Sequence, residues 1–381
     1  MAETVAPRRR IVYLSGTRAD FGLMQSTLQR LSADMDLAVA VTGTHLSAAF
    51  GHTLSEIQAA GLRVCGDIPV DVTTRTPLSM AVAVGDCLKG MAALLDRERP
   101  DLLLLLGDRG EMLAGAVAAL HLGLVCVHIH GGERSGTVDE PMRHAISKLS
   151  HYHCVATQGS RERLIRMGED PARILVSGAP GLDGLDAMGQ LTPAQTCAAL
   201  ALPSAQPFLL VLFHPVVQQA GDAYTQTVAL CQGLQAVGLP VVWLAPNADA
   251  GSLDVLRALD DTPLPAGSQR RQHLPRELFF AAMRHCVVMV GNSSAGIIEA
   301  ASFGTPVVNV GQRQCLRERN ANVSDVAPDA TAICQAVEQA LQHGRRPCEN
   351  VYGDGAAGAR IARWLAGLSL DRSVLNKVNA Y

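Results

Sequence analysis

The stretch that decides the fold is Asp101-Leu-Leu-Leu-Leu-Leu-Gly-Asp-Arg-Gly-Glu111. Five consecutive leucines, 102–106, predict a strand that is buried on both faces, as in a parallel sheet covered by helices. The polar turn that follows leads into an apolar helical segment, 111–121, and then into the next expected strand, 124–129. The stretch therefore predicts one β-α-β unit of a parallel α/β sheet.

The same alternation of short apolar runs and longer amphipathic segments continues on both sides of this unit. It covers residues 11–177 and restarts over residues 208–310. A Gly/Pro-rich stretch, 177–184, and a segment rich in Ala, Pro and Gln, 191–207, separate the two regions. We therefore expect an α/β fold of two Rossmann-like, doubly wound domains that face a cleft at the carboxyl ends of their sheets.

The composition limits the classes of function. The 381 residues carry 32 Lys and Arg against 35 Asp and Glu, so the broad basic field that nucleic-acid binding needs is absent. The ten cysteines form no C-x-x-C pair, which favours buried apolar side chains over a disulfide framework. The N-terminal MAETVAPRRR does not resemble a signal peptide, and the most apolar stretch, 112–127, is interrupted by two glycines and His121. We expect a cytoplasmic protein with a small-molecule partner, and neither a nucleic-acid nor a membrane partner.

Two expected turns of the first domain place polar residues just after a strand. In the segment 15–22, glycines would let backbone amides approach an anion, and Arg18 would add further donors; an ordinary strand–helix turn is the alternative. Asp108 follows the five leucines, where a carboxylate is costly unless it is used. Its alternative role is to cap the next helix.

A third turn of the first domain is rich in histidine and acidic residues. Strand periodicity would place His128 and His130 on one face, with Glu133 on the glycine turn beyond them. Asp139 or Glu140 could cap the next helix instead of acting in chemistry. The H-x-H pair suggests zinc, but the segment has no H-E-x-x-H and no third ligand at a metal-protease spacing. We therefore expect acid–base work here and no metal site.

The second domain offers residues suited to a nucleotide. One histidine follows the strand at about 208–213, and the segment 291–299 has two hydroxyls and two glycines that open an expected helix, as in a phosphate cradle. A plain N-cap serine and a core histidine are the alternatives. The candidate residues are His214, Ser293, Ser294, Gly296 and Glu299.

These motifs together resemble a known family. In chain order they are SGTRADFG, VTGTHLS, LGDRGE, HIHGGERSGTVDEPMRHAISKLSH, FHP, PNADAGS, GNSSAGIIEAASFGTPVVNVG and RQ..RER, between about residues 10 and 320. The set resembles the hydrolysing UDP-N-acetylglucosamine 2-epimerases of bacterial sialic-acid pathways and the epimerase half of the animal bifunctional enzyme. The resemblance implies a glycosyltransferase-B-like architecture and a homodimer or homotetramer. The expected domains are 1–185 with a C-terminal helix at about 364–381, and 186–363.

The resemblance also implies a reaction. Its family converts UDP-N-acetylglucosamine and water into N-acetylmannosamine and UDP, by elimination to 2-acetamidoglucal and hydration, without a cofactor. One alternative is the same reaction on UDP-N,N'-diacetylbacillosamine, as in legionaminic-acid pathways, since such relatives share most of these motifs. A second alternative is a UDP-sugar glycosyltransferase of the same fold, which would not need the acidic residues of the first domain.

Carried over by position, the resemblance gives Asp108 and Asp139 the roles of the family's essential acidic residues. It gives His214 a contact with the diphosphate. The implied UDP-sugar-binding residues are Arg18, His214, Ser293, Ser294, Gly296, Glu299 and Arg313. Part of the family carries a Glu where this chain has His130, which leaves open whether His130 or Glu133 does the work of that carboxylate.

Overall fold

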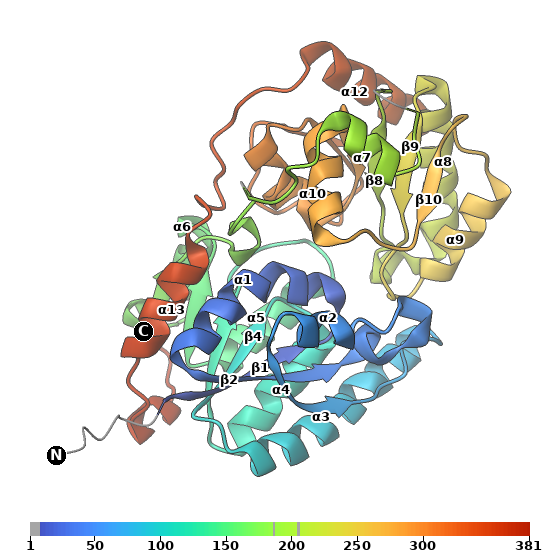
Figure 1. Ribbon diagram of the computed structural model, residues 1–381. Coiled ribbons are helices and arrows are strands. Elements are labelled where there is room, and N and C mark those ends of the chain that lie inside the picture. The colour runs from blue at the N-terminus through green and yellow to red at the C-terminus, as the bar shows by residue number, and fades with distance from the viewer. Residues whose placement is uncertain (1–7, 186, 204–205) are drawn as a thin grey trace.

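The computed structural model describes residues 8–185, 187–203 and 206–381. Within these ranges the chain forms two parallel sheets (Figure 1), the first with the strand order β3-β2-β1-β4-β5-β6-β7 and the second with the order β10-β9-β8-β11-β12-β13. This confirms the predicted fold class of two Rossmann-like domains in a glycosyltransferase-B-like arrangement. The expectation about a signal peptide rests mainly on residues 1–7, which lie outside the described ranges.

The first sheet and its helices occupy the lower half of Figure 1. Its strands are β1 (Arg10–Ser15), β2 (Asp36–Thr42), β3 (Arg63–Ile68), β4 (Leu102–Leu106), β5 (Val125–Ile129), β6 (Tyr152–Val155) and β7 (Ile174–Val176). The helices are α1 (Arg18–Asp34), α2 (Leu54–Ala59), α3 (Pro77–Glu98), α4 (Gly110–His121), α5 (Asp139–Leu149), α6 (Gln158–Arg166) and the C-terminal α13 (Ala357–Gly367).

The second sheet and its helices occupy the upper half. Its strands are β8 (Leu209–Leu212), β9 (Val241–Leu244), β10 (Gln269–Arg271), β11 (Val288–Gly291), β12 (Val307–Val310) and β13 (Val323–Val326). The helices are α7 (Pro193–Ala199), α8 (Ala223–Val237), α9 (Ser252–Asp261), α10 (Arg276–His285), α11 (Ser294–Ile298) and α12 (Ala330–His343). Short 3-10 turns lie at Gly43–Leu46, Ala48–Phe50, Pro171–Arg173, Pro180–Leu182, Val217–Asp222, Ala300–Phe303 and Arg372–Leu375.

The five leucines of β4 explain why this strand lies at the centre of its sheet. Leu103 and Leu105 pack into the core on the side of α3 and α4. Leu102, Leu104 and Leu106 pack into the core on the opposite side, with α1 and α13. Burying one such side chain fully contributes roughly 1.5–3 kcal/mol. A polar residue at any of these positions would therefore face a core, whichever way it pointed.

The chain ends by returning to the first domain. Helix α13 packs beside α1 (Figure 1), where Ile361 and Leu365 join its core. The sequence-based expectation placed this helix at about 364–381, but it ends at Gly367 because the residues beyond turn away and form only the 3-10 turn Arg372–Leu375. The domain limits at 185/186 and 363/364 stay predictions, and Asp186 itself lies outside the described residues.

The topology determines where a ligand site can form. The strand order reverses between β1 and β4 in the first sheet, and between β8 and β11 in the second. Ligands of doubly wound sheets bind at the carboxyl ends of the strands beside such a switch point. The segments after β1, β4, β5, β8, β11 and β12 carry the predicted site residues, and ion pairs join such segments of one domain to those of the other.

Candidate active site

The turn after β4 presents Asp108 to a buried cation. Its carboxylate forms an ion pair with Arg143 of α5, whose side chain is 1 % exposed. Burial lowers the pKa of Arg143 to about 9, which still leaves the guanidinium charged at neutral pH. The N-cap of α4 is Arg109 and has no side-chain cap bond, so Asp108 does not fill the capping role that was its alternative. The carboxylate is drawn towards Arg143 instead.

His128 supports that turn from the neighbouring strand. Its Nε2 lies 2.7 Å from the Gly107 carbonyl oxygen and its Nδ1 lies 3.0 Å from Ser147 Oγ. Burial lowers the pKa of His128 to about 3, so the ring is a neutral part of the core. The prediction that His128 and His130 share a strand face is wrong, because β5 ends at Ile129 and the backbone of His130 turns into the left-handed region with a φ of 64°.

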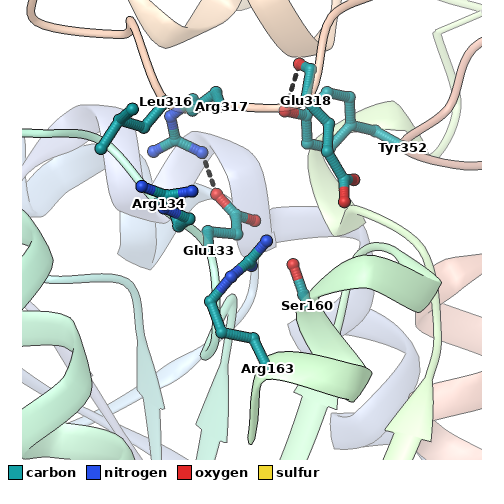
Figure 2. Close-up of a pocket in the computed structure, with 8 residues that line it drawn as sticks. All are labelled: Glu133, Arg134, Ser160, Arg163, Leu316, Arg317, Glu318 and Tyr352. Atoms are coloured by element: carbon teal, nitrogen blue, oxygen red, sulfur yellow. Dashed lines mark hydrogen bonds and ion pairs between the residues drawn. The ribbon is translucent and has the colours of Figure 1, made fainter. Parts of the chain in front are cut away.

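That turn directs His130 towards Glu133 and the second domain. His130 Nδ1 bonds Glu133 Oε1, while His130 Nε2 is buried without a hydrogen-bond partner. Glu133 Oε2 pairs with Arg317, which comes from the segment after β12 (Figure 2). The structure therefore places His130 and Glu133, the two candidates for the family's carboxylate, in direct contact. Glu133 has a second partner in Arg317, whereas Nε2 of His130 has none.

Asp139 and Glu140 separate into two roles at the start of α5. The Glu140 carboxylate accepts 2.9 Å hydrogen bonds from the backbone N–H groups of Ser135 and Gly136, so it closes the loop before the helix. Asp139 makes no such cap contact; its carboxylate lies 3.8 Å from Arg313 Nη2 of the second domain. Neither side chain therefore caps the helix, since Val138 is the N-cap of α5 and receives no side-chain cap bond: Glu140 closes the preceding loop, and Asp139 lies at the domain interface.

The turn after β1 corrects one expectation. The amides of Gly16 and Thr17, which the sequence pattern predicted to approach an anion, donate to the carboxylate of Asp20 at 2.9 and 2.7 Å. Asp20 and Thr17 form a capping box at the start of α1, which is the ordinary strand–helix turn. Arg18 pairs with Glu56 at 2.7 Å and donates to the Leu274 carbonyl, so it reaches across to the second domain. Its predicted contact with UDP stays a prediction.

In the second domain, His214 is held in one tautomer. The backbone N–H of Asn247 donates to His214 Nδ1 at 3.1 Å, and the side chain of Asn292 bonds both the N–H and the carbonyl of His214. Burial lowers the pKa of His214 to about 3. The neutral ring therefore carries its proton on Nε2, where it can donate to an anion such as a diphosphate.

The segment after β11 holds the residues of the predicted phosphate cradle, which stays a prediction. Ser293 is the N-cap of α11, as the alternative proposed, and Ser294 is half-buried beside it. Helix α11 spans only five residues, so its dipole is smaller than the sequence pattern suggested. A side chain on Gly296 would meet Val307 at 3.0 Å, so this glycine serves close packing. The two hydroxyls remain the candidate phosphate ligands.

Glu299 lies at the end of α11 without a full set of partners. It is buried, and its Oε2 has no hydrogen-bond partner. Burial raises the pKa of Glu299 to about 7, and the charge of Arg276 opposes that rise. A buried carboxylate with an open oxygen can accept hydrogen bonds from hydroxyl groups of a ligand. This agrees with the predicted ribose contact, which stays a prediction.

Sequence reasoning missed several cations that complete the site. Arg143 holds Asp108, Arg317 holds Glu133, and Arg109 lies 3.5 Å from Asp249 of the second domain. Arg143 and Arg317 stand inside the quoted motifs, but a sequence does not show which carboxylate a cation will meet. Among residues 8–185, 187–203 and 206–381, no three His, Cys, Asp or Glu side chains converge as a metal would require.

One protein family matches most of the chain. The family model for UDP-N-acetylglucosamine 2-epimerase matches residues 28–366. A Legionella pneumophila protein described as UDP-N,N'-diacetylbacillosamine 2-epimerase (hydrolyzing) is 45% identical over 98% of this chain and 100% of its own length. The UDP-N-acetylglucosamine 2-epimerase of Neisseria meningitidis is 33% identical, over 91% of each chain.

A solved structure has the same fold. The crystal structure of a UDP-GlcNAc 2-epimerase from Neisseria meningitidis, bound to UDP-GlcNAc, superimposes with a TM-score of 0.78 over 93% of this chain and 99% of that chain. The sequence identity in that superposition is 17%, so it demonstrates the shared architecture and not the shared chemistry.

Proposed function

Because the chain belongs to the family of hydrolysing UDP-N-acetylglucosamine 2-epimerases, we propose that it converts a UDP-2-acetamido sugar and water into UDP and the free sugar inverted at carbon 2. The observation that carries the proposal is the pairing of acidic residues of the first domain with arginines, one from the first domain and one from the second. Asp108 meets Arg143, and Asp139 meets Arg313. A glycosyltransferase of this fold has no need of such a set.

The substrate we propose is UDP-N,N'-diacetylbacillosamine. Sequence motifs alone placed UDP-N-acetylglucosamine first and this sugar second. The order changes because the Legionella relative named for the diacetamido sugar is 45% identical over its full length, against 33% for the Neisseria relative named for UDP-N-acetylglucosamine. The product would then be the free 2,4-diacetamido-2,4,6-trideoxy sugar with the manno configuration, a precursor of a legionaminic-type acid.

The proposed division of labour follows the two domains. His214, Ser293, Ser294 and Glu299 of the second domain would hold UDP, and the turns of the first domain would act on the sugar. Loss of UDP breaks the bond from carbon 1 to oxygen while a base removes the proton on carbon 2, which gives a 2-acetamidoglycal. Hydration then returns a proton to the opposite face of carbon 2 and adds a hydroxyl to carbon 1. Each step needs a placed acid or base, which carboxylates and histidines supply.

Product analysis with both UDP-sugars side by side, and with no acceptor present, tests the proposal. We expect UDP and an epimerised free sugar from both compounds or from the diacetamido compound alone, with the higher kcat/KM for the diacetamido sugar. Faster turnover of UDP-N-acetylglucosamine would overturn the substrate assignment. No free sugar without an acceptor, but transfer when an acceptor is added, would favour the glycosyltransferase alternative.

We also propose that the chain works in the cytoplasm as a homodimer or homotetramer. Helix α3 is long and apolar enough to span a membrane by length and composition only. Its Met91 and Leu95 are buried in the core beside the first sheet, while Leu78 and Val82 are 74% and 54% exposed. A second copy packed on these exposed side chains is the arrangement we favour. Light scattering of the purified chain tests it, since a monomeric mass at micromolar concentration would contradict it.

A further inference from the structure

Arg317 connects the second domain to the turn after β5. Its guanidinium pairs with Glu133 Oε2 across the domain interface, in the small pocket drawn in Figure 2. The two side chains are only 8% and 4% exposed. Two opposite charges buried this deeply stay ionised because each compensates the other. Removing either side chain would leave the other charge buried and uncompensated. Glu133 is therefore held as a carboxylate by a residue that belongs to the other domain.

That carboxylate orients His130. Because Glu133 is ionised and can only accept, His130 Nδ1 must be the donor in their contact. The neutral ring then carries a lone pair on Nε2, which is buried and has no hydrogen-bond partner. The backbone of His130 also adopts the left-handed region, which is unfavourable for a residue with a side chain. A strained residue with an open, buried base is typical of a group that acts on a ligand.

A chain of contacts ties this dyad to the nucleotide half of the site. Arg317 Nε donates to Gln314 Oε1 at 2.5 Å, and Gln314 Nε2 donates to the Asn292 carbonyl at 3.2 Å. The Asn292 side chain in turn donates to the His214 carbonyl at 2.8 Å. Groups that would meet the diphosphate and a group that would meet carbon 2 are thus joined through Arg317.

We propose that Arg317 is a positioning residue for proton transfer at carbon 2: it holds Glu133 ionised, Glu133 fixes the tautomer of His130, and His130 Nε2 removes the proton. The inference rests on the proposed function and specifies its elimination step. The electron pair of the C2–H bond forms the C1=C2 double bond, the bond from carbon 1 to oxygen breaks, and its electron pair leaves with UDP. The proton remains on His130 as an imidazolium paired with Glu133 and then passes to solvent. Hydration adds hydroxyl to carbon 1 and takes its carbon-2 proton from an acid on the opposite face.

The charges around His130 agree with a base that is neutral at rest. Burial and, to a smaller extent, the charge of Arg317 together lower the pKa of His130 to about 4, and Glu299 opposes the change. Glu133 faces the His130 ring from the same turn. The neutral His128 lies on β5, the strand that leads into that turn. Removing the cation of Arg317 should therefore raise the pKa of His130. The acid limb of the kcat–pH profile would move to higher pH.

Four variants separate these roles, with UDP affinity measured by calorimetry as the check on folding. With the UDP-sugar that the wild type turns over, His130→Gln and Glu133→Gln should lower the rate of UDP release by about 10²-fold or more. Hydration of the 2-acetamidoglycal, supplied directly, should fall far less, because its carbon-2 proton comes from another group. Arg317→Gln should lower kcat about tenfold and shift the acid limb of the kcat–pH profile to higher pH. Arg317→Lys keeps the positive charge and should partly reverse both changes.

Arg270→Gln is the matched control, since Arg270 pairs with Asp260 on the exposed surface of the same domain. It should change neither kcat nor the pH profile. Arg317→Gln with an unmoved acid limb, or His130→Gln with UDP release close to wild type, would overturn the inference. His130→Glu, which places a carboxylate at the same position, should release UDP faster than His130→Gln. Failure of the proposed function gives a different result, in which the wild-type chain releases no epimerised sugar from either UDP-sugar.

Discussion

His130 and His214 stand in opposite domains and present the same ring nitrogen, Nε2, in opposite states of protonation. His214 accepts the Asn247 N–H on Nδ1, at 3.1 Å, and so keeps its proton on Nε2. His130 bonds Glu133 through Nδ1 and leaves Nε2 as a lone pair. Burial lowers the pKa of both rings, so both are neutral at pH 7. One histidine is therefore prepared to donate to an anion and the other to accept a proton, as loss of UDP with removal of a proton requires.

The carboxylates of the first domain should decide turnover without deciding nucleotide affinity. Asp108→Asn and Asp139→Asn should each lower kcat by about 10²-fold or more, because neither amide can exchange a proton with the sugar. The UDP dissociation constant from calorimetry should change little, since the second domain holds the nucleotide in our proposal. Near-normal turnover in either variant would show that the carboxylate only pairs with its arginine and takes no part in proton transfer.

The nucleotide site should show a pH dependence that comes from Glu299. Burial raises the pKa of Glu299 to about 7, so its carboxylate is increasingly protonated below that pH and accepts hydroxyl donors less well. Glu299→Gln and Ser294→Ala should both weaken UDP binding, by about tenfold for a lost charge-assisted hydrogen bond. Wild-type affinity should fall from pH 8 to pH 6 more steeply than that of Glu299→Gln. The phosphate of UDP titrates equally in both, so equal slopes would contradict the assignment.

Activity should survive prolonged chelation. Both nitrogens of His128 are engaged within the protein, by Gly107 and Ser147, and Nδ1 of His130 is engaged by Glu133. The H-x-H pair is thus divided between a core contact and an acid–base dyad, and within the part of the chain that the structure describes neither ring joins a group of three His, Cys, Asp or Glu side chains that could hold a metal. Turnover after dialysis against EDTA should match untreated enzyme. A loss that zinc or magnesium restores would refute this reading of the histidine cluster.

The sequence was sufficient for the central strands and insufficient for the edges of the sheets. The five leucines of β4 are apolar on both faces, so burial could be predicted without knowing the neighbours. Strand β10 is Gln-Arg-Arg and β13 is Val-Ser-Asp-Val, and such short polar edge strands give no apolar run to detect. Helix α12 was missed although Asp329 caps it and Ile333 and Val337 recur at helical spacing; that signal was present.

The site shows the same limit at the level of single residues. Positions such as Asp108 and His130 could be located by the strand ends that precede them. Their partners Arg143 and Glu133 could not be assigned, because the contacts depend on side-chain direction within a turn or between the turn and a helix of the same domain. The turn after β1 is a different case. Its sequence pattern predicted amides free to bind an anion, but the amide of Gly16 donates to the carboxylate of the chain's own Asp20.

The C-terminal residues should contribute to stability through Glu169. This carboxylate is buried, and it lies 2.8 Å from Lys148 Nζ, 2.9 Å from His153 Nε2 and 2.6 Å from Lys377 Nζ. Lys377 also donates to backbone carbonyls at the end of α5. Burial alone would raise the pKa of Glu169, but its hydrogen bonds and the nearby cations outweigh that effect and lower it to about 2. Lys377, in the C-terminal segment, thus completes a cluster of charges around Glu169, which is not one of the proposed catalytic or binding residues.

Lys377→Ala should lower the free energy of unfolding by about 1–3 kcal/mol, because it leaves a buried carboxylate with fewer donors. Since the pKa of Glu169 is lower in the folded chain than its ordinary 4.5, its stabilisation is present above that pH and is lost as pH falls from about 4.5 towards 2. Lys377→Ala should therefore shift acid unfolding to higher pH. Denaturant titrations at pH 7 and pH 4 measure both effects, with Lys89→Ala, at an exposed position of α3, as the control expected to stay within about 0.5 kcal/mol. Equal stability of Lys377→Ala and Lys89→Ala at pH 7 would show that the C-terminal segment does not stabilise the fold.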